Sequence, residues 1–148
     1  MIMATFRHAT PGSILASRRV IVSDAITNGN TDFTIQQPAN STLDSCIVRA
    51  LDTIVTDANA TASFRCGLSA AGGVDAIANT ALLGGSADTI NAGAVFTAAG
   101  AAGAKSNGAA AVVATENRDL YFRIISDQPA TAPDNGRLEV TLVFRIFD

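Results

Sequence analysis

The fold is decided by one stretch late in the chain, Gly136-Arg137-Leu138-Glu139-Val140-Thr141-Leu142-Val143-Phe144-Arg145-Ile146-Phe147. Side chains of a strand alternate between its two faces, so one face here collects only apolar residues: Leu138, Val140, Leu142, Phe144 and Ile146. The other face carries mainly polar residues: Arg137, Glu139, Thr141 and Arg145. A long strand that is buried on one face needs a second sheet to cover it, which predicts a β-sandwich.

The composition favours an all-β protein of one domain. The 148 residues include a single lysine, Lys105, and two glutamates, whereas these two residue types normally cover the surface of helices. Threonine, valine, isoleucine and phenylalanine supply strand formers, and glycine, asparagine and aspartate supply turns. Only 5% of the chain is aromatic, so the core is modest for its length.

Period-two patterns and turn residues divide the chain into about eight strand candidates, which is the number in a jelly roll. They cover residues 18–26, 32–36, 43–55 (with a kink), 61–69, 88–96, 111–115, 120–125 and 138–147. We expect the last two to form an antiparallel pair joined by a long loop. Helical spacing of Val74, Ile77, Ala78, Ala81 and Leu82 predicts at most one short helix, between residues 73 and 84. One core should contain nine residues: Leu138, Val140, Leu142, Phe144, Leu120, Phe122, Ile124, Phe64 and Val20.

The fold prediction is therefore a two-sheet antiparallel sandwich of jelly-roll type at residues 18–148, preceded by an extended arm at residues 1–17. Pro11-Gly12 interrupts the arm. Arg7, Arg18 and Arg19 give the first 23 residues a charge of +3, whereas the remainder has seven basic and thirteen acidic groups and a charge of −6. Two interpretations of these arginines stay open: solvated charge, or an arm that contacts an acidic neighbouring subunit. Because residues 24–148 are this acidic, we do not expect the protein to bind nucleic acid.

No combination of residues predicts catalysis, a metal site or a cofactor. His8 is the only histidine, so neither a zinc site nor a histidine-activated nucleophile is expected. Cys46 and Cys66 are not in a Cys-x-x-Cys pair, and we expect both to be free and buried. The turn aspartates (Asp57, Asp75, Asp88, Asp127 and Asp134) are expected to cap backbone groups of their own turns. No apolar run approaches the roughly 20 residues of a membrane-spanning helix.

Three parts of the sequence carry a resemblance to a known family. They are the short strand Ser63-Phe64-Arg65-Cys66-Gly67-Leu68-Ser69, the small-residue element Gly73-Val74-Asp75-Ala76-Ile77-Ala78, and the closing segments Leu120-Tyr121-Phe122-Arg123-Ile124-Ile125 and residues 136–144. In this order and texture, residues 43–148 resemble the small jelly-roll decoration, or cement, proteins of tailed bacteriophages. The resemblance rests on element order and offers no invariant site, so no functional residue is transferred.

The resemblance implies a non-enzymatic virion protein that is made in the cytoplasm of the host bacterium and bridges major capsid protein subunits on the outer capsid surface. It implies self-association, for which we favour a trimer over a dimer, and no membrane partner. One alternative is a head-fibre or tail-fibre adhesive module that binds a host glycan or surface protein, and an exposed aromatic platform or an acidic calcium cleft would favour it. Another is a non-viral bacterial sandwich domain of unknown role.

Overall fold

The structure is a computed structural model that describes residues 3–10, 13–57, 59–68, 78–85, 89–98, 114–132 and 136–147. Every regular element in these residues is a β-strand, and they contain no helix long and apolar enough to cross a membrane. The strands in chain order are β1 (Met3–Thr10), β2 (Ser13–Val22), β3 (Gly29–Gln37), β4 (Ser41–Ala50), β5 (Ile54–Thr56), β6 (Thr61–Gly67), β7 (Ala78–Gly84), β8 (Thr89–Ile90), β9 (Val95–Ala98), β10 (Arg118–Ser126), β11 (Ala130–Ala132) and β12 (Leu138–Phe147).

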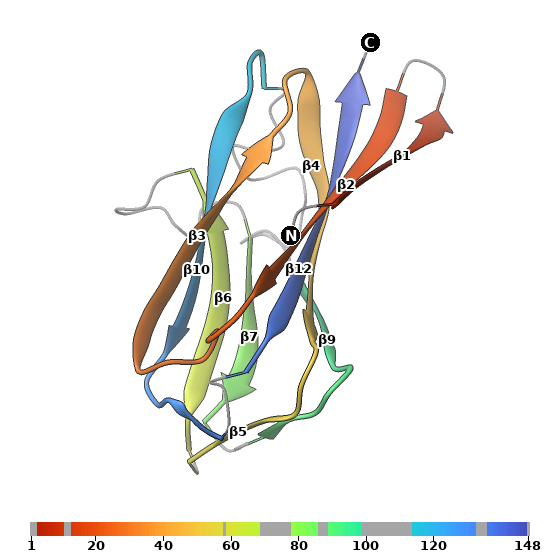
Figure 1. Cartoon of the computed structure of the whole chain (residues 1–148). Helices are drawn as coiled ribbons and strands as arrows, with labels where there is room; N and C mark the ends of the chain where they lie inside the picture. Colours follow the sequence, from red (N-terminus) through yellow and green to blue (C-terminus); the bar gives the residue numbers. More distant parts are fainter. Residues whose placement is uncertain are drawn as a thin grey trace.

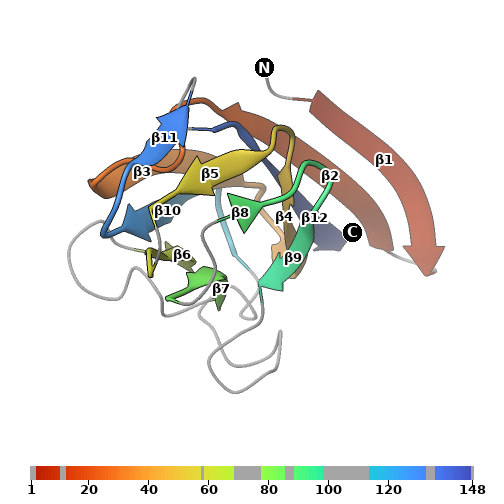
Figure 2. The ribbon, with the colours of Figure 1, turned by 90° about the horizontal axis from the view of Figure 1, so that it is seen from below.

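Two antiparallel sheets pack face to face as a sandwich (Figure 1). The five-stranded sheet has the order β1-β2-β12-β4-β9, and the four-stranded sheet has the order β3-β10-β6-β7. Strands that follow one another in the sequence thus often lie in opposite sheets, as in a jelly roll. A small third sheet, β11-β5-β8, lies across the lower end of the sandwich (Figure 2). The predicted fold class is confirmed.

The core lies between the two large sheets and follows the alternation in β12. The inward residues of β12 from Leu138 to Phe144 are completely buried, and the residues between them are half-buried. From the facing sheet, the ring of Phe122 stacks on Phe33 and on Phe64, with ring centroids 5.2 and 5.6 Å apart. All nine residues predicted for the core belong to it, with Val20 partly buried at its margin.

The predicted pairing of the last two long strands is wrong. β10 lies between β3 and β6, whereas β12 lies between β2 and β4, so the two strands face each other across the core. The alternation of apolar residues shows which face of a strand is buried, but it does not show which strand is its hydrogen-bonded neighbour. Two strands that each have one apolar face can be hydrogen-bonded neighbours in one sheet, or they can face each other from opposite sheets. Here they lie in opposite sheets.

The predicted helix is also wrong where the structure describes it. Residues 78–84 form β7, paired with β6, while residues 73–77 lie outside the described residues. A bulge beside Ala62 and Ser63 places an extra residue in β7, and Leu82 and Leu83 are both buried as a result. Consecutive buried residues break the period of two, so the strand alternation is not visible in this part of the sequence.

The boundary expected at residue 17 does not mark the start of the sandwich. β2 begins at Ser13, and its whole length pairs with β12, from Ser13 opposite Phe147 to Val22 opposite Leu138. β1 then pairs with β2 as an edge strand instead of extending away from the sheet. The sequence pattern predicts this strand only from Arg18 onward, because small residues such as Ala16 and Ser17 weaken the apolar alternation before it.

The single long strand expected at residues 43–55 is instead two strands: β4 belongs to the five-stranded sheet and β5 to the small third sheet. The expectation that Cys46 and Cys66 are free and buried in the core is confirmed.

Removal of the central aromatic ring should destabilise the whole sandwich. Phe122→Ala is expected to lower the free energy of unfolding by about 3–5 kcal/mol, because Phe122 is buried and stacks on two other rings. Denaturant unfolding followed by circular dichroism measures this. A loss below about 1 kcal/mol would contradict the described packing.

Gly136 is the second point at which the fold should be sensitive. Its φ is +76°, and a Cβ there would overlap the side chain of the buried Ile54. Gly136→Ala should cost about 3–5 kcal/mol from backbone strain and overpacking together. Gly93 has a φ of +85°, and a Cβ added there would have nothing within 4 Å, so Gly93→Ala is the matched control for strain alone, at about 1–2 kcal/mol. Equal losses would mean that Ile54 does not restrict Gly136.

Candidate functional site

The residues that normally carry chemistry are held in structural roles in the described part of the chain. Burial raises the pKa of the Cys46 thiol to about 12. Burial, followed by the charge of Cys46, raises the pKa of Cys66. The thiolate is the reactive form of cysteine, so neither thiol is activated at neutral pH. Within the described residues, no three His, Cys, Asp or Glu side chains lie close enough together to hold a metal ion. The side chain of His8 is outside the described residues.

Asp127 joins the end of β10 to the start of β6. Its carboxylate accepts hydrogen bonds from the Thr61 backbone N–H, at 2.7 Å, and from the Thr61 hydroxyl, at 2.9 Å. The backbone N–H of Asp127 donates in turn to the Thr61 carbonyl, at 3.2 Å. The hydrogen bond from the Thr61 N–H lowers the pKa of Asp127. The sequence pattern predicts that this carboxylate caps its own turn, but the backbone N–H that it binds at 2.7 Å belongs to Thr61, at the start of a different strand.

Two further aspartates form bidentate ion pairs with arginines. Arg123 donates to Asp32 at 2.6 and 2.8 Å between neighbouring strands β10 and β3. Arg137 donates to both carboxylate oxygens of Asp52, each at 2.8 Å, and so links the start of β12 to the segment after β4. These hydrogen bonds lower the pKa of both carboxyl groups. Asp75, Asp88 and Asp134 lie outside the described residues.

A buried glutamine fastens the upper end of the sandwich, and no pattern in the sequence indicates it. The Gln37 side chain is completely buried, and its Nε2 donates to the Ser41 carbonyl at 2.8 Å. Arg118 Nε donates to Gln37 Oε1, also at 2.8 Å. Backbone hydrogen bonds also join Ala114 to Asn40 and Ser41, which follow β3 in the chain. Gln37 occupies an inward position of a strand that is otherwise amphipathic, and only its partners explain why a polar residue is tolerated there.

Arg18 and Arg19, two of the three arginines of the first 23 residues, face opposite sides of the five-stranded sheet. Arg19 forms an ion pair with Glu139, at 3.1 Å, on the outward face of the five-stranded sheet. Arg18 pairs in register with the buried Leu142, so it occupies the inward side of β2 and is half-buried. Arg7 pairs with Leu15 in the β1–β2 hairpin, and its side chain is outside the described residues. Adjacent strand residues face opposite ways, which separates Arg18 from Arg19.

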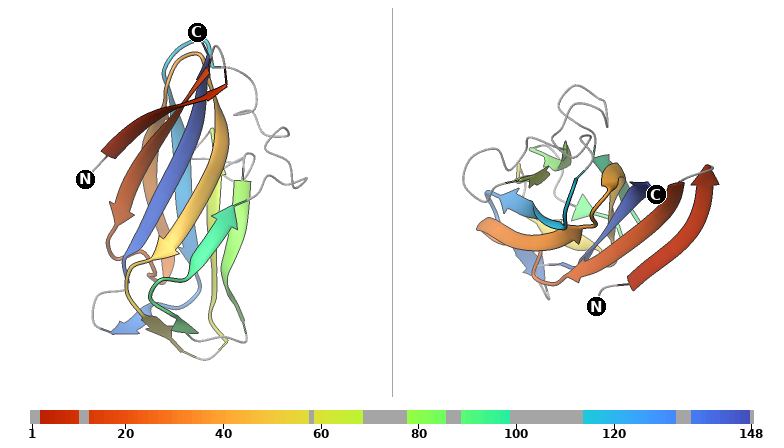
Figure 3. Two further views of the ribbon diagram at one scale, coloured as in Figure 1. Left: turned by 90° about the vertical axis from the view of Figure 1, so that its right-hand side faces the viewer. Right: turned by 90° about the horizontal axis from the view of Figure 1, so that it is seen from above.

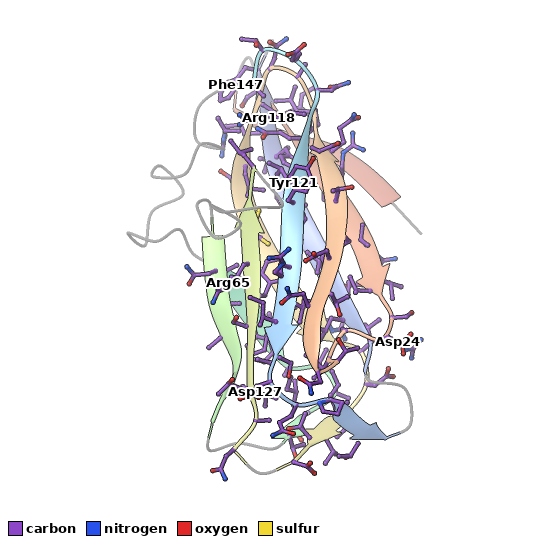
Figure 4. The ribbon with its side chains drawn as sticks, turned by 90° about the vertical axis from the view of Figure 1, so that its left-hand side faces the viewer. Asp24, Arg65, Arg118, Tyr121, Asp127 and Phe147 are labelled. Atoms are coloured by element: carbon purple, nitrogen blue, oxygen red, sulfur yellow. The ribbon has the colours of Figure 1, made fainter. Side chains whose placement is uncertain are left out.

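The outward face of the four-stranded sheet is polar. Along β3, the residues Asp32, Thr34 and Gln36 are exposed. Figure 4 shows Tyr121 and Arg65 on this face, Arg118 near its upper end and Asp127 near its lower end. Tyr121, the one tyrosine of the chain, is half-buried and pairs in register with Gly67.

The outward face of the five-stranded sheet is the other extended surface. Four of its charged side chains form ion pairs within the sheet: Arg19 with Glu139, and Arg145 with Asp44 at 3.4 Å. Half-buried apolar residues lie between these two ion pairs. An apolar area bordered by satisfied polar groups is the usual anatomy of a protein contact, so this face is the candidate interaction surface.

Comparison with known family profiles and with curated protein sequences gives no match. Among solved structures, the chain is similar to chains of three bacteriophage capsids. One is the acidic stable capsid of Helicobacter pylori bacteriophage KHP30, with 14% identity, a TM-score of 0.49, and coverage of 97% of this chain and 94% of that chain. The second is the capsid of Ralstonia phage GP4, with 14% identity, a TM-score of 0.48, and coverage of 90% and 85%. The third is the capsid asymmetric unit of cyanophage Pam1, with 19% identity, a TM-score of 0.47, and coverage of 95% and 93%.

The Asp127 link should make stability depend on acid pH. A carboxyl group whose pKa is lower in the folded state than its ordinary value of 3.8 stabilises the fold above that value. This contribution is lost as the pH falls through the folded-state pKa. Asp127→Asn should therefore lower the melting temperature at pH 7, and the difference from the original protein should shrink toward pH 2.

Asp57→Asn, at another exposed position, is the control for replacing an aspartate without removing the hydrogen bonds to Thr61. Thermal melts of the three proteins across this pH range provide the measurement. A constant offset for Asp127→Asn at every pH would mean that the charge of Asp127 does not contribute.

Proposed function

We propose that this chain is a non-enzymatic structural protein of a bacteriophage virion. In this role it decorates or cements the outer surface of the capsid by bridging subunits of the major capsid protein. The observation that carries the proposal is the position of the segments that resemble decoration proteins. Residues 63–67 lie in β6, residues 120–125 in β10 and residues 138–144 in β12, which are interior strands of the two sheets.

The geometry fits a protein that works through its surfaces. The two large sheets provide extended faces on opposite sides of a packed core, and the ion pairs of Asp32, Asp52 and Asp44 hold surface side chains in place. Side chains that are already ordered lose less entropy when a contact forms. Repeated on a symmetric particle, many contacts of modest strength give a high total avidity.

The proposed partners are other copies of the chain, in a trimer rather than a dimer, and the major capsid protein. The proposed location is the outer surface of the virion, after synthesis in the cytoplasm of the host bacterium. Arg7, Arg18 and Arg19 are the proposed contact residues. They belong to a hairpin at the edge of the sheet, so a contact through them would involve the edge strand β1 and not a free arm.

Virion stoichiometry tests the role directly. Quantitative mass spectrometry of purified virions should find this chain at a copy number comparable to that of the major capsid protein. A few copies per particle would instead support the fibre or adhesive module. Absence from virions would overturn the proposal.

Removal of β1 tests how the chain attaches. Deleting residues 1–12 leaves β2 intact, whereas deletion to residue 17 would remove five residues of β2 that pair with β12. The shortened protein should fold, but it should occupy stripped particles less fully than the complete chain, and the difference should narrow with added salt. Equal occupancy by both proteins at every salt concentration would show that β1 and Arg7 do not contribute to attachment.

A further inference from the structure

A diagonal row of apolar side chains crosses the outward face of the five-stranded sheet. Val143 lies on this face of β12, because its neighbours Leu142 and Phe144 are buried in the core. On β2, Leu15 pairs in register with Arg145 of β12. Arg145 is the next outward residue after Val143 along β12. Leu15 and Val143 are therefore diagonal neighbours. Residues in this relation lie about 7–8 Å apart and are within reach of large side chains.

The row continues on the other side of β12. Ile47 of β4 pairs in register with Thr141 of β12. Thr141 is the outward residue that precedes Val143 along β12. Val95 of β9 pairs with Arg49, which is one outward position beyond Ile47. Leu15, Val143, Ile47 and Val95 thus form a continuous row across four strands, which we call the apolar diagonal. Val95 is 60% exposed and the other three are half-buried, while no described element covers this face (Figure 3, left).

Two ion pairs lie beside the apolar diagonal. The Arg19–Glu139 pair lies on one side, and the Arg145–Asp44 pair on the other. With the exposed Arg49, the face carries three arginines and two carboxylates on β2, β12 and β4, a sum of +1, although the whole chain has a net charge of −3. Contact between two copies through this face therefore opposes no large charge of one sign.

The size of this face also suits a stable contact. Five strands about 4.8 Å apart and up to ten residues long have a face of roughly 700 Å². A standard protein interface buries about 800 Å² on each partner. The outward face of the four-stranded sheet differs, because its β3 edge has only exposed polar side chains at the outward positions from Asn30 to Gln36.

We propose that the apolar diagonal is the surface through which copies of this chain associate, with a second copy of the chain as its occupant. The inference rests on the proposed function and extends it, because it names the surface through which one copy of the chain contacts another. It is tested on purified protein without any particle, so its failure is separate from the failure of the virion role.

Two matched lysine substitutions provide the test. Val143→Lys introduces a charge at the centre of the apolar diagonal. Ile125→Lys is the control: Ile125 is also β-branched, half-buried and outward on an interior strand, and both residues pair with small polar neighbours. Each lysine can extend its charged end into solvent in the free protein, so both variants should fold with similar melting temperatures.

Sedimentation velocity over a concentration series measures association. The original protein and Ile125→Lys should form the same oligomer, whereas Val143→Lys should sediment as a monomer or dissociate at concentrations about 30-fold higher or more. An original protein that stays monomeric would overturn the proposal, as would a Val143→Lys variant with unchanged association. If Val143→Lys does not fold, Val95→Lys, at the exposed end of the row, takes its place with the same expected outcome.

Discussion

The structure depends on the contact between the buried face of β12 and the aromatic cluster of the opposite sheet. β12 lies between β2 and β4, so its inward side chains form the centre of the five-stranded sheet. Opposite them, Phe122 lies between Phe33 and Phe64 and fills the middle of a core that contains few other aromatic rings. Apolar burial there stabilises both sheets at once, and the remaining strands extend this central contact outward.

Charged groups serve mainly to join elements that are distant in the sequence. Asp127 joins β10 to β6, Arg137 joins the start of β12 to Asp52, and Arg118 contacts Gln37 at the opposite end of the sandwich. Exposed ion pairs each contribute little stability, but they fix the positions of long side chains. A surface whose side chains are already ordered loses less entropy when it forms a contact.

The two outward faces have different characters although both sheets contribute to the same core. The four-stranded sheet presents exposed polar residues along β3, while the five-stranded sheet presents the apolar diagonal between two ion pairs. The inward residues of each sheet are determined by packing, whereas the outward residues are free to differ. The difference between the faces therefore bears on interactions with other molecules more than on folding.

The sequence alone determined which side chains are buried, since alternation is a local property: it placed Leu138 and Phe122 in the core and indicated an all-β protein. It did not determine which strands are neighbours: its pattern suggests that β10 and β12 pair, whereas they lie in opposite sheets. It also suggests a helix where residues 78–84 form the bulged strand β7. Nor does the sequence indicate the candidate surface. Leu15, Val143, Ile47 and Val95 are far apart in the chain, and they form a row only because the registers of three strand pairs shift each residue by one outward position. Register is set by contacts across the whole sandwich, and only the tertiary structure decides it.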